Sequence, residues 1–148
     1  MKKNEMNNKG FSLVELIIVI AIMVILAVAL APVFTKQLER SRVASDVNTA
    51  STLAECITVA LTEGKINVPT SAPTATTLLD SSNCGASKTF DSITAAPVAK
   101  TKVVTDGKFY YLITTSGEVQ IYVNTSTAAT ADNMVYPTVG ATFSSYTN

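Results

Sequence analysis

The sequence predicts an α+β fold: one long N-terminal α-helix that spans a membrane with its first half and packs with its second half on a small antiparallel β-sheet. Residues 11–34 are apolar at 21 of 24 positions. Residues 35–63 contain neither glycine nor proline and keep a helical spacing of apolar side chains. Residues 101–148 hold β-branched and aromatic runs that are separated by turn residues.

Residues 11–34 are long and apolar enough to cross a membrane as a helix. At 1.5 Å per residue they span roughly 36 Å, and the hydrocarbon core of a bilayer is about 30 Å thick. Lys2, Lys3 and Lys9 precede this segment, and basic flanks stay in the cytoplasm. We therefore expect a single-pass membrane protein whose N-terminus is cytoplasmic and whose remainder is exported.

Two ordinary fates of such a segment remain open. A secretory signal peptide would be cut after its apolar region, and Ala29-Leu30-Ala31 has the A-x-A form of such a cleavage site. The apolar run is longer than the usual run of about 7–15 residues, however, and Pro32 would follow the cut. A plain signal anchor would instead keep the helix as a passive tether.

Glu15 is the unusual residue of the apolar segment. A carboxylate costs up to about 3 kcal/mol at the centre of a bilayer and less near the interface, so such a residue is a functional candidate. The residues from Lys9 to Glu15 read K-G-F-S-L-V-E and lead into the long apolar run. This stretch resembles the class III signal of type IV pilins and their pseudopilin relatives.

The resemblance implies a defined processing chemistry for the leader, residues 1–10. A dedicated prepilin peptidase would cut between Gly10 and Phe11 on the cytoplasmic side and methylate the new amine of Phe11. Glu15 would become the fifth residue of the mature chain, where the family keeps a glutamate. The resemblance implies that Glu15 pairs with the terminal amine of a neighbouring subunit and sets the register of assembly. A contact between residues i and i+4 within one helix is the alternative.

Pro32 also matches a proline that is common in the family. A proline inside a helix lacks the backbone donor and can kink the helix. Many type IV pilins carry a glycine upstream of this position, whereas this chain has no glycine between Phe11 and Glu63. We expect any kink of the helix to depend on Pro32.

A one-sided apolar stripe predicts that the helix continues through residues 35–63, with Gly64 as its stop signal. The charged side chains, Asp46 among them, are assigned to the other faces of the helix. The stripe consists of Val43, Val47, Ala50, Ala54, Ile57 and Leu61, and is widened by Leu53 and Ala60.

Residues 64–100 predict a long connection between helix and sheet, because prolines, serines and threonines interrupt every periodic pattern. A short strand at residues 89–93 is expected within it. Cys56 on the helix and Cys84 in this loop both belong to the exported part, which favours a disulfide that pins the loop to the helix. Two free buried thiols are the alternative.

Two runs of strand-forming residues flank Ser116-Gly117 and predict a hairpin. Pairing about that dipeptide puts Tyr110 opposite Val123 and Leu112 opposite Ile121. These side chains are expected to face the helix, together with the pair Thr114 and Val119. The other face would carry Phe109, Tyr111 and Tyr122 beneath loop or C-terminal residues.

Two further strands are expected beside this hairpin, within residues 101–148. Residues 102–104 would form one of them, which ends at the turn signal Asp106-Gly107. Residues 134–143 would form the other, and Pro137 indicates that this strand lies at an edge of the sheet.

Composition argues against several classes of function. The chain has 11 basic and 11 acidic residues and no histidine. Specific nucleic-acid binding and histidine-based acid–base catalysis are therefore not expected. The sequence also lacks a P-loop, a glycine-rich dinucleotide motif and a CxxC pair. We expect no enzymatic activity, no metal and no cofactor.

The resemblance implies a structural role. The chain would rest in the cell membrane and then polymerise with other pilin subunits into an extracellular type IV pilus. Assembly would require the prepilin peptidase, an ATPase and an inner-membrane platform, and the filament would serve adhesion, motility or DNA uptake. A pseudopilin of a type II secretion or competence system is one alternative. A membrane-tethered binding module without a polymer is another.

Overall fold

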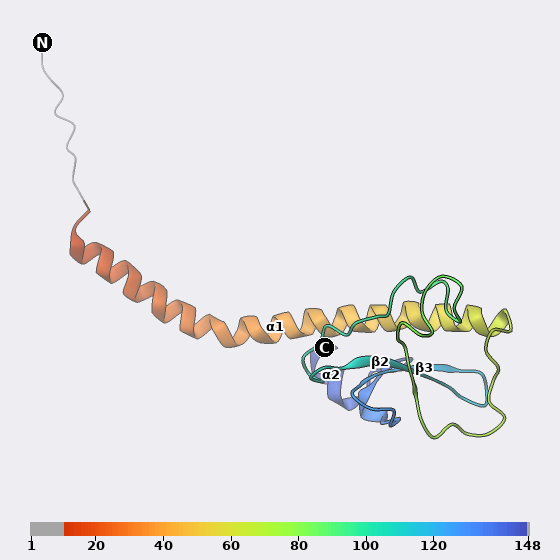
Figure 1. The fold of residues 1–148 in the computed structure, drawn as a ribbon. Helices are drawn as coiled ribbons and strands as arrows, with labels where there is room; N and C mark the ends of the chain where they lie inside the picture. The colour runs from red at the N-terminus through yellow and green to blue at the C-terminus, as the bar shows by residue number, and fades with distance from the viewer. Residues whose placement is uncertain (1–10, 148) are drawn as a thin grey trace, which may run out of the picture. The chain divides into compact units, whose positions relative to one another are not determined.

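The computed structural model describes residues 11–147, so the predicted leader and Gly10 lie outside the described residues. The fold is α+β, as the sequence predicts (Figure 1). Two compact units divide the chain: Met1–Lys36, which we call the N-terminal segment, and Gln37–Asn148, which we call the head. The elements, in chain order, are helix α1 (Leu13–Thr62), strands β1 (Thr77–Leu78), β2 (Lys108–Ile113) and β3 (Val119–Asn124), the 3₁₀ helix η1 (Ala131–Asn133), strand β4 (Met134–Tyr136) and helix α2 (Ala141–Thr147).

Helix α1 belongs to both units and confirms that the helix continues beyond the apolar residues. Pro32 lies inside it. Its end is a Schellman motif, in which Gly64 has a φ of 72° and the Lys65 N–H donates to the carbonyl of Ala60. The Gly64 N–H donates to the carbonyl of Leu61. The predicted stop signal therefore ends the helix through its left-handed backbone conformation.

The head is built on a four-stranded antiparallel meander with the strand order β1-β2-β3-β4. In Figure 1 the second half of α1 lies along this sheet. The main core is formed between helix and sheet, because both surfaces present buried apolar side chains to one cluster. From α1 and the central strands it includes Val43, Ala50, Leu53, Ala54, Ile57, Ala60, Phe109, Ile113, Val119, Ile121 and Val123.

The register of the β2–β3 hairpin differs by one residue from the prediction. Tyr110 pairs with Tyr122 and Ile113 pairs with Val119, so the predicted pairs of Tyr110 with Val123, Leu112 with Ile121 and Thr114 with Val119 are wrong. The turn contains three residues, 115–117, and is closed by the Thr114 N–H donating to the Glu118 carbonyl at 2.9 Å. Gly117 has a φ of 83°, as expected for the left-handed position of such a loop.

This difference of one residue exchanges the two faces of strand β2, because side chains alternate along a strand. Phe109 is in the core beside α1, and Tyr111 packs against that core in edge-to-face contact with Phe90, with ring centroids 5.3 Å apart. Tyr110 and Leu112 instead join Tyr122 in a smaller buried cluster. The prediction of which residues face the helix is therefore wrong for this strand.

Three short segments also differ from their predicted structure. Residues 102–104 form no strand, and residues 89–93 contribute only an isolated bridge between Cys84 and Phe90. Strand β4 lies at the edge of the sheet, as Pro137 indicates. It ends at Tyr136, however, and the end of the strand predicted at residues 134–143 belongs instead to α2. Phe143 anchors α2, with 1% of its surface exposed, and this burial outweighs the weak helix propensity of the surrounding threonines and serines.

Candidate functional site

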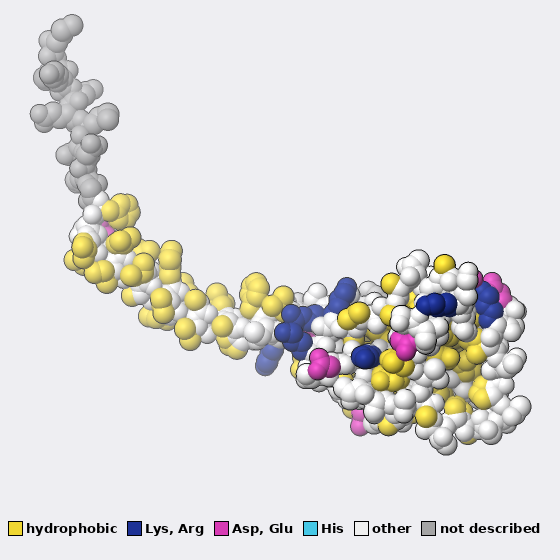
Figure 2. Space-filling view, in the orientation of Figure 1, with side chains coloured by type: hydrophobic (Ala, Val, Ile, Leu, Met, Phe, Trp, Pro, Cys, Tyr) yellow, Lys and Arg dark blue, Asp and Glu magenta, His cyan; other side chains and the backbone are white. Residues whose placement is uncertain are grey.

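The described part of the N-terminal segment, residues 11–36, presents apolar side chains on all sides. Every described residue from Phe11 to Lys36 is exposed, and Figure 2 shows hydrophobic side chains along this part of α1. One stretch of the helix is long and apolar enough to cross a membrane, and none of it is buried within the chain. An apolar surface of this extent marks contact with lipid or with other protein.

Glu15 lies in the first turn of α1, at the end of the helix where Phe11 is found. Its Oε2 accepts a hydrogen bond from the backbone N–H of Ser12 at 3.1 Å. A glutamate three residues after a serine is the arrangement of a capping box, and a negative charge is favoured at the positive end of the helix dipole. The structure thus brings Phe11 and Glu15 to one end of the helix and gives the carboxylate a partner within its own chain.

Pro32 lies apart from Phe11 and Glu15, near the end of the apolar segment. Thr35 Oγ1 donates a hydrogen bond to the Pro32 carbonyl at 3.0 Å. The carbonyl that loses its donor because of Pro32 is that of Val28, four residues earlier, so the bond from Thr35 does not replace the missing donor. The pairing of Glu15 with a terminal amine and a kink at Pro32 stay predictions.

The predicted disulfide between Cys56 and Cys84 is not present in the structure, which has both as free cysteines. The loop is held to the core by other means. Leu79 and Phe90 are 2% and 1% exposed, and Cys84 is itself a member of the core cluster. The Cys84 Sγ lies 3.3 Å from Asn83 Oδ1. The loop thus carries buried anchors that its serine- and threonine-rich composition did not suggest.

Denaturing alkylation of the unreduced, exported chain is expected to label both Cys56 and Cys84. Burial raises the pKa of both thiols, so both are protonated and slow to react in the folded chain. Cys56 is half-buried and Cys84 is buried; native labelling should therefore reach Cys56 first. Intact mass measures the labels. A denatured chain that takes up none without reductant would show that the disulfide forms.

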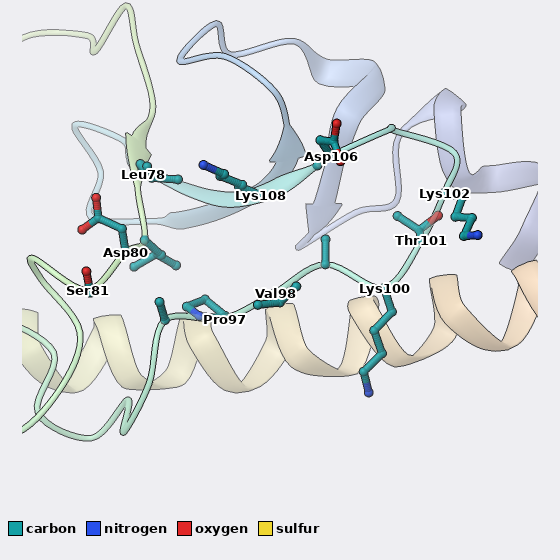
Figure 3. Close-up of a pocket in the computed structure, with 14 residues that line it drawn as sticks. Leu78, Asp80, Ser81, Pro97, Val98, Lys100, Thr101, Lys102, Asp106 and Lys108 are labelled. Carbon is teal, nitrogen blue, oxygen red and sulfur yellow. The ribbon is translucent and has the colours of Figure 1, made fainter.

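Two carboxylates on α1 bind the backbone of residues 100–103, an interaction that the sequence analysis missed. Asp46 accepts hydrogen bonds from the backbone N–H of Lys100 at 2.9 Å and of Thr101 at 2.7 Å. Glu39 Oε1 accepts from the backbone N–H of Lys102 at 2.6 Å and of Val103 at 3.2 Å, and from Thr101 Oγ1. We call this arrangement the carboxylate clamp. Figure 3 shows Lys100, Thr101 and Lys102 on the segment that runs beside α1.

The two carboxylates of the clamp have opposite shifts of pKa. Asp46 is 1% exposed, and burial raises its pKa although the amides of Lys100 and Thr101 favour its charged form. Burial also acts to raise the pKa of Glu39, but hydrogen bonds from Thr101, Lys102, Arg42 and Val103 outweigh it, so that pKa is lowered. The donors that bind Glu39 thus outweigh its burial, whereas the amides that bind Asp46 do not outweigh the burial of that carboxylate.

The helical spacing of the core positions could have revealed that Asp46 is buried. Residues 43, 46, 50, 53, 57 and 60 follow each other at steps of three and four, and all of them are buried. Asp46 therefore occupies a position of the core stripe rather than a solvated face. A carboxylate in a core position requires hydrogen-bond donors, although the sequence does not say which donors those are.

A groove of about 560 Å³ lies beside the clamp (Figure 3). Its walls are the end of β1, residues 96–102 and the start of β2. Val98 on its rim is 77% exposed, and Asp80, Asp106 and Lys108 contribute single charges. Within the described residues, 11–147, no group of three or more Cys, Asp or Glu side chains is placed to hold a metal ion. The groove therefore combines apolar side chains with single charged ones and shows no recognisable catalytic arrangement.

Comparison with known proteins identifies the N-terminal region. Residues 6–31 match the family model described as the prokaryotic N-terminal methylation motif, which includes Gly10, Phe11 and Glu15. No curated protein and no solved structure matches the chain. Together with the exposed apolar helix, the match indicates a substrate of a prepilin peptidase that is anchored in the membrane before assembly. The chain carries the class III signal of type IV pilins and pseudopilins.

Proposed function

We propose that this protein is a structural subunit of a type IV pilus and not an enzyme. A prepilin peptidase cuts it between Gly10 and Phe11 and methylates the amine of Phe11, and the mature chain polymerises with other pilin subunits into an extracellular filament. The observation that carries this proposal is the apolar N-terminal segment, whose described residues are exposed on every side of the helix. Outside lipid, such a helix is stable only when other apolar helices cover it.

The position of Glu15 supports an assembly role rather than a passive tether. Its carboxylate lies in the first turn of the helix with one oxygen on the Ser12 amide. Cleavage would create a cationic amine at Phe11, at the same end of the helix. A cation and a carboxylate attract strongly in a medium of low dielectric constant, and each offsets the cost of desolvating the other. The contact with the Ser12 amide would stabilise the start of any such helix, whereas an ion pair with the terminal amine of a neighbouring subunit has a use only in assembly.

The chain supplies binding surfaces for assembly but no recognisable source of energy for it. Helices in lipid gain little from the hydrophobic effect when they associate, because lipid tails are as apolar as leucine. Moving the subunit from the membrane into a filament therefore requires work from outside. A separate ATPase and an inner-membrane platform are the partners that this proposal requires.

Electron microscopy of surface filaments tests the proposal when cells with the natural chain are compared with cells that express Gly10→Leu. The substitution enlarges the residue before the cut and is expected to leave the leader in place and abolish long filaments. Asn8→Ala in the same leader is the matched control and is expected to leave filaments unchanged. Mass spectrometry of the mature N-terminus should find one added methyl group on Phe11. Absence of filaments from cells with the natural chain would favour a pseudopilin or a tether.

A further inference from the structure

Four basic residues gather at one end of the head. Arg40 and Arg42 lie on the first turns of α1 in the head, and Lys100 and Lys102 belong to the loop segment that the carboxylate clamp holds against the same turns. Lys100 Nζ reaches Ser45 Oγ at 2.9 Å, which places this lysine directly on the helix. Figure 2 shows several Lys and Arg side chains together at one end of the head. We call these four residues the basic collar.

The collar carries net positive charge at the surface. Arg40, Lys100 and Lys102 are exposed, and the side chain of Arg42 is 38% exposed although it pairs with Glu39 at 3.1 Å. Glu39 and Asp46 reduce this charge, since one Glu39 oxygen pairs with Arg42 while the other oxygen and Asp46 accept from backbone amides, but the four basic residues outnumber these two carboxylates. Farther along the loop, the formal charges of Asp106 and Lys108 cancel. A chain with no net charge overall thus concentrates cations in one place.

The chain itself restricts where the collar lies when the N-terminal segment is in a bilayer. The apolar residues end at Phe34, and Arg40 follows six residues later. Residues 35–40 belong to helix α1, and six helical residues rise about 9 Å, so Arg40 lies within about one Debye length of the end of the apolar residues. Long basic side chains extend their charges toward lipid headgroups. Each basic residue near an anionic surface contributes about 1 kcal/mol within a Debye length.

We propose that the basic collar binds the phosphodiester groups of anionic lipids at the exported face of the membrane while the subunit awaits assembly. This inference rests on the membrane-anchored stage of the proposed function. The clamp contributes to it, because the backbone bonds to Asp46 and Glu39 hold Lys100 and Lys102 against α1, in addition to the bond from Lys100 Nζ to Ser45 Oγ. The collar gives the anchored subunit a preference among lipids that the apolar helix alone does not provide.

Spin-labelled lipids measure this preference directly. The full chain is reconstituted in phosphatidylcholine vesicles that contain a trace of spin-labelled phosphatidylglycerol or, separately, of spin-labelled phosphatidylcholine. The fraction of motionally restricted label gives the relative association of each lipid with the protein. We expect phosphatidylglycerol to be preferred at low salt. The double variant Lys100→Gln/Lys102→Gln should lower that preference by up to about thirtyfold, and 1 M salt should lower it in the natural chain.

The glutamine variants keep the backbone amides that the clamp binds, so the head retains those bonds. Lys65→Gln/Lys88→Gln is the matched control, because it removes the same charge from the head outside the collar, and it should leave the preference unchanged. Equal loss in both double variants, or no preference in the natural chain, would overturn the inference. Phosphate that abolishes the preference at an ionic strength where chloride does not would also overturn it, in favour of a site for the free anion.

Two further measurements distinguish lipid binding by the collar from membrane anchoring and from DNA binding. Alkaline extraction of the same vesicles reports whether the chain is anchored at all. A chain that is extracted would refute the membrane-anchored stage itself, whereas an anchored chain without lipid preference refutes only the role of the collar. Duplex DNA that binds through Lys100 and Lys102, with no lipid preference, would make the collar a nucleic-acid surface and overturn the proposal.

Discussion

Glu15→Ala is expected to lower the yield of surface filaments by about tenfold or more while membrane insertion stays intact. The apolar helix is unchanged by the substitution, so the chain still enters the bilayer. A terminal amine without its carboxylate partner would stay uncompensated in an apolar environment, and breaking a buried ion pair costs about 3–5 kcal/mol. Quantitative immunoblotting of sheared filaments measures the yield, and alkaline extraction of membranes measures insertion.

The variant Glu15→Gln separates the two roles that the carboxylate can have. Glutamine keeps an oxygen that can accept the bond from the Ser12 backbone N–H, which Glu15 accepts at 3.1 Å, but it has no charge. Loss of filaments in both variants would assign the effect to the charge. Filaments that persist with glutamine and vanish with alanine would assign it to the helix start. A yield equal to that of the natural chain in Glu15→Ala would contradict any assembly role for this residue.

Asp46→Ala is expected to lower the free energy of unfolding of the head by about 2–5 kcal/mol. The substitution removes the acceptor for the backbone N–H groups of Lys100 and Thr101, and a buried donor without a partner costs about 1–3 kcal/mol. Urea unfolding of the full chain in detergent, followed by circular dichroism, measures the change. Glu55→Ala is the control, because Glu55 is exposed on the same helix and its loss should change stability by less than about 0.5 kcal/mol.

The two carboxylates of the clamp should also change the dependence of stability on pH in opposite directions. The pKa of Asp46 is raised above its ordinary value of 3.8, so its contribution is complete below that value and is lost as pH rises through the folded pKa. The pKa of Glu39 is lowered below 4.5, so its contribution is present above 4.5 and is lost as pH falls through the folded pKa. The stability advantage of the natural chain over Asp46→Asn should therefore shrink as pH rises, whereas its advantage over Glu39→Gln should grow. Parallel trends in both variants would contradict these shifts.

Local patterns were sufficient to predict the elements that depend on local physics. The apolar segment, the continuous helix and its stop at Gly64 follow from composition, periodicity and the conformational freedom of one glycine. The two central strands follow from runs of β-branched and aromatic residues. The register of these strands was wrong because Thr115 belongs to a three-residue turn, whereas the dipeptide Ser116-Gly117 suggested a two-residue turn. One residue of difference in a turn is enough to exchange the faces of a strand.

Contacts between distant parts of the chain were beyond the reach of the sequence. Asp46 and Thr101 are 55 residues apart, and no local pattern announces that a loop will offer its amides to a helix. Leu79 and Phe90 lie in a loop that is rich in serine and threonine, yet each is almost fully buried. The processing site, in contrast, could be predicted because its residues are close to one another in the sequence. Gly10, Phe11 and Glu15 lie within six consecutive residues, and their significance depends on that spacing alone.

The carboxylate clamp also makes the head mechanically robust against pulling along α1. Glu39 and Asp46 are seven residues apart, which is about 10 Å of helix, and they bind four successive amides. Tension along the helix from the N-terminal segment would act on all of these hydrogen bonds in parallel. A force on the helix is thereby passed to residues 100–103 and, through the chain that follows, to strand β2.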